Sequence, residues 1–167
     1  MNHPNAAEVY QEIKNAWKAT KAPPDSEMQY FTKGFGGGDA SVFLNVRPMD
    51  IDQENERFLI GDALGEMSPV AASAYLGPYL LAFLEDLKFQ EDQGFFSEPM
   101  LRGSVISFLS LPRTWSVYLK PNLTKDSKTA LLLTVDYILQ KKDLLKLNPQ
   151  KIGAFERLGR EIKRDAF

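Results

Sequence analysis

The chain has no cysteine among its 167 residues and only one histidine, His3. The absence of cysteine excludes disulfide scaffolds, thiolate catalysis and cysteine-ligated zinc or iron–sulfur sites. Because the single histidine lies in a terminal stretch, we expect neither a Ser-His-Asp triad nor a metal site with several histidines. We therefore expect no metal site and no bound cofactor.

Long hydrophobic runs are also scarce. The first seventeen residues contain no continuous apolar run of the kind that a signal peptide needs. Residues 67–84 are uncharged and close to the lower length limit of a membrane helix, but Pro69 opens the stretch, Pro78 interrupts it and its flanks are acidic. We expect a buried hairpin of the core there, no membrane contact and a cytoplasmic location.

Composition and periodicity together indicate the fold class. The chain is 44% hydrophobic and 25% charged, which is typical of one globular domain over residues 1–167. Apolar spacing and capping residues predict a mostly α, compact bundle of about six helices around two buried apolar helices. The expected helices cover residues 6–20 after Asn5, 52–64, a segment from Ser68 to Leu87 that Pro78 bends or splits, a segment from Ser97 to Pro112, 124–142, and a last helix from Asn148 onward.

A glycine-rich segment separates two stretches of extended character. Val42, Leu44 and Val46 alternate with other residues, which predicts a strand over 41–47. The glycines at 34–38 match neither a dinucleotide fingerprint nor a P-loop, so a turn is the simpler interpretation. We expect either a small β ribbon near residues 28–47 or an ordered loop there. Residues 113–123 should be irregular or briefly extended.

Charge is distributed unevenly along the chain. Residues 50–98 hold eleven acidic and two basic side chains, a net charge of −9, whereas residues 101–167 hold thirteen basic and six acidic ones, a net charge of +7. A surface of one sign steers association with partners of the other. The acidic segment starts like a calcium loop, but Asn55 and Gly61 stand where such a loop needs glycine and glutamate.

The leading hypothesis is a protein-interaction protein that binds a basic protein through Asp50, Asp52, Glu54, Glu56, Asp62 and Glu66. We expect no nucleic-acid partner, because the chain is acidic overall and carries no recognisable module.

Two other classes of function stay open. Tyr75, Tyr79 and Phe83 share one helical face, which is typical of a core but would also suit a ligand pocket completed by Glu85 and the glycine loop. That interpretation makes the chain a small-molecule binding module. The third hypothesis is a metal-free, hydrolase-like enzyme that uses Glu85 or Asp86 with Tyr79. Catalysis is the least expected of the three, because adjacent carboxylates on a helix do not face each other.

One segment resembles an uncharacterised family of short bacterial domains. That family has the pattern Ser-Pro-x-Ala-x-x-x-Tyr-Leu-Pro-x-x-Leu-Leu-x-x-Leu-Glu-Asp, and this chain is similar to it from Ser68 to Asp86, with Gly77 as an additional residue before Pro78. Residues 12–24 and 123–139 are also similar to it. The resemblance implies a helical fold and a bacterial origin, and it assigns no chemistry. With the charge pattern, it leads us to expect a cytosolic protein of the immunity or inhibitor kind.

Overall fold

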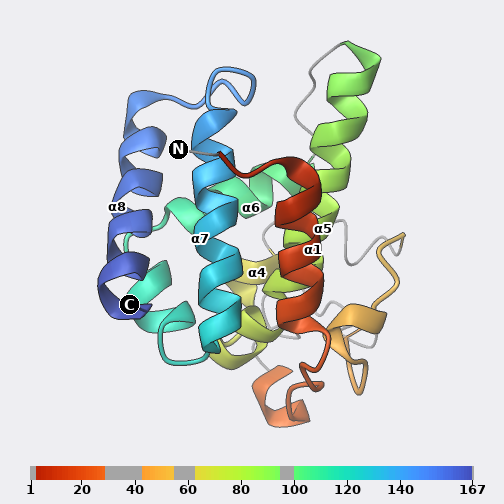
Figure 1. Ribbon diagram of the computed structural model, residues 1–167. Helices are drawn as coiled ribbons and strands as arrows, with labels where there is room; N and C mark the ends of the chain where they lie inside the picture. The colour runs from red at the N-terminus through yellow and green to blue at the C-terminus, as the bar shows by residue number, and fades with distance from the viewer. Residues whose placement is uncertain (1–2, 29–42, 55–62, 95–99, 167) are drawn as a thin grey trace.

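Helices account for most of the chain that the computed structural model describes, namely residues 3–28, 43–54, 63–94 and 100–166 (Figure 1). The prediction of a mostly α protein is confirmed. No helix within the described ranges is long and apolar enough to cross a membrane. The α-helices are α1 (Ala6–Trp17), α4 (Ala63–Glu66), α5 (Pro69–Gln93), α6 (Met100–Ser110), α7 (Lys125–Gln140) and α8 (Pro149–Ala166). Short turns of helix are η1 (Asp25–Met28), η2 (Pro48–Asp50) and the π-helical η3 (Thr114–Leu119).

The predicted helix starts at Asn5, Thr124 and Asn148 are confirmed by capping hydrogen bonds. The Asn5 side chain accepts from the Glu8 backbone N–H at 3.0 Å, and the Glu8 carboxylate accepts from the Asn5 N–H, which makes a capping box. Thr124 Oγ1 accepts from the Ser127 N–H at 3.1 Å, and Asn148 Oδ1 accepts from the Lys151 N–H at 2.8 Å. Each cap satisfies a backbone donor that the first helical turn leaves without a partner.

Helix α5 is the centre of the molecule and corrects the predicted hairpin. It runs for 25 residues from the Ser68 cap to Gly94, which ends the helix at φ 69°, and it continues through Pro78. A proline inside a helix removes one backbone hydrogen bond and costs about 3 kcal/mol. Most residues from Ala71 to Leu87 are nonetheless buried, so contacts with the surrounding helices outweigh that cost and keep the helix whole. The segment is therefore one helix and not two.

The contact between α1 and α5 depends on a glycine. A Cβ atom added at Gly77 would lie 2.4 Å from Cγ and 2.9 Å from Cβ of Trp17, the last residue of α1. The Trp17 indole N–H donates to the carbonyl oxygen of Ser73 at 3.1 Å. Only glycine lets the indole ring lie this close to the backbone of α5.

The described part of the segment before α5 contains neither the predicted strand nor the helix start predicted at Asp52. Residues 43–45 form a turn with Asn45 at φ 56°, so the strand predicted over 41–47 is wrong in its described part, and the β ribbon is not supported. The Tyr75 hydroxyl contacts the carbonyl oxygens of Phe43 and Val46 at 2.6 and 2.8 Å, so a side chain rather than a neighbouring strand satisfies them. Residues 51–54 are also not helical, which corrects the helix start predicted at Asp52. The glycine loop at 34–38 lies outside the described residues.

The C-terminal helix α8 contacts η3 through polar side chains. The sequence predicted irregular structure over residues 113–123, which include η3. Asp165 accepts from the Trp115 indole N–H at 2.8 Å and pairs with Lys120 at 3.2 Å. Hydrogen bonds from Arg164 and then from Trp115 hold the pKa of Asp165 well below its ordinary value. Helix α8 packs Phe155, Leu158 and Ile162 inward. The bundle is thereby closed on the side opposite α1 (Figure 1).

Candidate functional site

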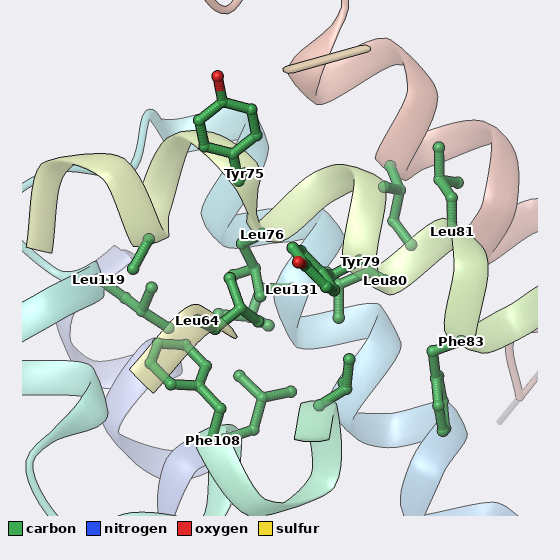
Figure 2. Close-up of a cluster of buried hydrophobic side chains, with 14 of the residues drawn as sticks. Leu64, Tyr75, Leu76, Tyr79, Leu80, Leu81, Phe83, Phe108, Leu119 and Leu131 are labelled. Carbon is green, nitrogen blue, oxygen red and sulfur yellow. The ribbon is translucent and has the colours of Figure 1, made fainter. Parts of the chain in front are cut away.

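The aromatic stripe of α5 lies in the core. Tyr75, Tyr79 and Phe83 are each 0% exposed. Figure 2 shows their side chains with buried leucines of α5 itself and of α4, η3 and α7, and the Tyr75 hydroxyl lies at the edge of the cluster. Burial raises the pKa of Tyr75 to about 12 and also raises that of Tyr79, so both hydroxyls stay protonated at neutral pH. The structure thus places three of the four residues proposed for a ligand pocket in packed surroundings.

Glu85, the fourth residue of that predicted pocket, lies on the surface of α5. Its Oε1 accepts from the Tyr10 hydroxyl of α1 at 2.7 Å. This hydrogen bond, with a smaller effect of burial, raises the pKa of Tyr10. The pair lies in a groove of about 530 Å³ between the two helices, which Ala6, Ala7, Tyr10, Gln11, Leu84, Glu85 and Lys88 line. Sequence reasoning missed Tyr10, because it is 75 residues from Glu85 and nothing in the local pattern links the two.

The carboxylates considered for catalysis have different partners. Glu85 is bonded to Tyr10 and not to Tyr79, and Asp86 accepts from the Gln90 side chain at 3.3 Å. Asp86 is half-buried whereas Glu85 is exposed, so the two side chains do not share one environment. Within the described ranges, no group of three or more histidine, aspartate or glutamate residues is placed to hold a metal ion.

Three of the predicted partner-binding acids share one exposed loop, which we call the acidic loop. Asp50, Asp52 and Glu54 are all exposed, directly after or at the end of η2. Asp50 lies 3.8 Å from the Arg47 guanidinium, a pair in which both side chains are more than half exposed. Such a pair contributes little to stability and leaves the carboxylate available to solvent. Glu66 is half-buried in α4, and Glu56 and Asp62 lie outside the described residues.

A turn within the acidic loop and contacts of the segment before it hold the loop in place. Asp52 Oδ1 accepts from the Glu54 backbone N–H at 3.0 Å, which closes a local turn. Arg47 donates to the Lys18 carbonyl oxygen at 2.5 Å, and the preceding turn rests on Tyr75 of α5. The Phe43 ring lies edge-on to the Tyr75 ring with 5.1 Å between centroids. The acidic loop is therefore held in one conformation by contacts with the rest of the protein.

Tyr75→Phe tests this support. The substitution removes the hydroxyl that bridges two carbonyl oxygens, and we expect the free energy of unfolding to fall by about 1–3 kcal/mol. Because the folded-state pKa of about 12 lies above the ordinary value of 10.0, the hydroxyl contributes stability below pH 10 and loses it as the pH rises toward 12. Urea unfolding at neutral and alkaline pH measures both effects. A variant as stable as the parent, with an unchanged alkaline slope, would contradict the bridging role.

A second hollow lies where three helices meet. It has a volume of about 400 Å³ and is bounded by the end of α1, the following prolines, the first turns of α5 and the start of α7. Its wall is mostly apolar, and two of its hydroxyl groups bond within the protein: Ser73 donates to the Tyr118 carbonyl at 2.8 Å, and Thr124 donates to Ser127 at 3.0 Å. No local pattern of the sequence indicates that Pro23 and Pro24 form part of the wall of a hollow. The lining residues include Ala16, Trp17, Lys21, Pro23, Pro24, Val70, Ser73, Leu123, Thr124 and Ser127.

Comparison of the chain with protein-family models, with curated proteins and with solved structures finds no match.

Proposed function

We propose that this chain is a cytoplasmic protein-interaction protein, of the immunity or inhibitor kind, that binds a basic protein through its acidic loop. The observation that carries the proposal is that Asp50, Asp52 and Glu54 expose three carboxylates within five residues, with Arg47 as a weak, exposed counter-ion. Glu56, Asp62 and Glu66 belong to the same acidic segment of the sequence, and the proposal includes them.

Two physical arguments support the acidic loop as a binding surface. A local excess of one charge raises the rate at which a partner of opposite charge arrives and orients it on arrival. The turn closed by Asp52 and the support from Tyr75 hold the loop in place before binding, so less conformational entropy is lost when the complex forms. A loop of this kind favours a partner whose contact surface carries several lysine or arginine side chains.

The test compares two variants that have the same change in net charge. The first carries D50K, D52N and E54K; the asparagine keeps an acceptor for the turn at position 52. The matched control carries E12K, D143N and E156K, three exposed acids on other elements. Each tagged protein is used to capture partners from lysate of the source organism and is eluted in rising salt, with mass spectrometry of each step.

We expect the parent and the control to retain the same basic protein and to release it at moderate salt, because the interaction between exposed charges is screened. The loop variant should retain at least about tenfold less, as expected when central charged contacts are lost. Equal retention by all three proteins, or no retained basic protein at low salt, would overturn the proposal.

A small-molecule binding module is the second candidate, and the hollow beside Trp17 favours it. Its volume of about 400 Å³ is within the range of ligand sites, and its wall is mostly apolar with Lys21 as a charged residue at the rim. A thermal-shift screen of metabolites tests it, since a ligand at 100 times its Kd adds about 2.7 kcal/mol of stability. A reproducible shift that V70W abolishes by filling the hollow supports this function, and a flat response across the screen counts against it.

A further inference from the structure

The outer face of α5 carries an apolar side chain that the bundle does not cover. Phe89 is 59% exposed, the largest exposed fraction among the large apolar side chains of the described chain. It lies one helical turn after Glu85, in the last two turns of α5, a helix whose C-terminal end extends beyond the start of α1 (Figure 1). Covering an exposed phenyl ring with another apolar surface removes apolar area from water and is therefore favourable.

A groove beside this ring has the size and lining to receive one like it. The groove between α1 and α5 has a volume of about 530 Å³, and its wall is mostly apolar. Ala6 and Ala7 line it on the α1 side, where their short side chains leave room, and the buried Leu84 lies on the α5 side. The protruding ring and the groove thus lie within about one helical turn of each other on the same surface.

The charged residues of the groove are of both signs. Glu85 and Lys88 lie three positions apart on α5 and both are exposed. The Tyr10 hydroxyl fixes the Glu85 carboxylate, and Lys14 lies over the Tyr10 ring with 5.7 Å from its Nζ to the centroid. The other charged groups on these faces have known roles or positions: Glu8 closes the α1 capping box, whereas Glu12 and Asp92 are exposed beyond the groove.

We propose that two copies of the chain associate about a two-fold axis across the C-terminal half of α5, with Phe89 of each copy in the groove of the other and Lys88 of each copy facing Glu85 of the other. A two-fold interface brings the same patch of both copies together, so the patch must complement itself. A patch that contains both a protruding ring and a receiving groove, and both an acid and a base, meets that requirement. One crossing of two helices covers a small area, so the dimer should depend on protein concentration.

Sedimentation equilibrium of the full chain over a wide concentration range tests the dimer. We expect reversible dimerisation, and we expect F89A to weaken it at least about tenfold, because an aromatic side chain inserted in a groove is the usual centre of binding energy. L111A is the matched control, since Leu111 is also exposed, at 53%, but lies after α6 and away from the groove. A chain that stays monomeric at all concentrations, or an F89A variant that dimerises like the parent, would overturn the proposal.

Charge exchange tests the pairing of Glu85 with Lys88 separately. E85K alone and K88E alone should each weaken the dimer, because like charges would face each other across the axis. A mixture of the two variants should recover dimers that contain one copy of each. In such a dimer the two lysines of the E85K copy would face the two glutamates of the K88E copy. Y10F controls for the loss of the hydroxyl contact and should dimerise like the parent. No recovery in the mixture, or dimers that persist in each single variant, would contradict this arrangement, and neither result bears on the acidic loop.

Discussion

Gly77→Ala is expected to lower the free energy of unfolding by about 3 kcal/mol or more, at the upper end of the usual cost of overpacking. The new methyl group would lie 2.4 Å from Cγ and 2.6 Å from Cδ2 of Trp17. These atoms belong to the inner part of the indole, close to the α1 backbone, so rotation of the ring does not remove the clash. Either α1 moves away from α5 or the Trp17 hydrogen bond to Ser73 is lost.

Gly153→Ala is the matched control for this prediction. Gly153 is an exposed position of α8 where an added Cβ meets nothing within 4 Å. Alanine is the better helix former, so we expect this variant to gain about 0.5–1 kcal/mol. Urea unfolding of both variants measures the contrast.

A double variant identifies the clash as the cause. Trp17→Ala alone should cost about 3–5 kcal/mol, because the side chain is 1% exposed. With the ring absent, only the 2.9 Å contact with the Cβ atom of residue 17 remains, so Gly77→Ala should cost much less than it does in the parent, and the two effects should fail to add. Additive effects would show that the cost at position 77 comes from another source.

Phe83→Ala is expected to cost about 3–5 kcal/mol of stability, because its ring is 0% exposed and lies in the core (Figure 2). Phe89→Ala is the matched control on the same helix, since its ring is 59% exposed. At protein concentrations low enough to give monomers, we expect the control to lie within about 0.5 kcal/mol of the parent. If Phe83 were instead a ligand-contacting residue in an open pocket, the two variants would have similar stability.

Much of the helical architecture could be predicted from local signals. The caps at Asn5, Thr124 and Asn148 depend on a side chain and a backbone donor three positions later, and a sequence shows that relation directly. The continuous α5 could not be predicted, because Pro78 is a local signal for a break and the contacts that outweigh it come from distant segments. The turn at 43–45 was mistaken for a strand for the same reason, since Tyr75 lies about thirty positions away.

The candidate sites also differ in whether a local pattern or a contact between distant segments defines them. Charge can be read from a sequence, and the acidic loop is exposed as expected for a charged segment. The aromatic stripe could be placed on one helical face, but whether that face meets the core or an opening depends on the neighbouring helices. The Tyr10–Glu85 pair and the hollow beside Trp17 join segments that are far apart in the chain, so neither could be found before the fold was known.

The most direct test of the proposed function is zero-length carbodiimide cross-linking of the chain with the basic protein that it captures. This reagent joins a carboxylate to a lysine amine only when the two are in contact. We predict cross-links from Asp50, Asp52 and Glu54 to lysines of the partner, and their loss at high salt as the charges are screened. Cross-links confined to carboxylates on other elements, with none from the acidic loop, would contradict the account.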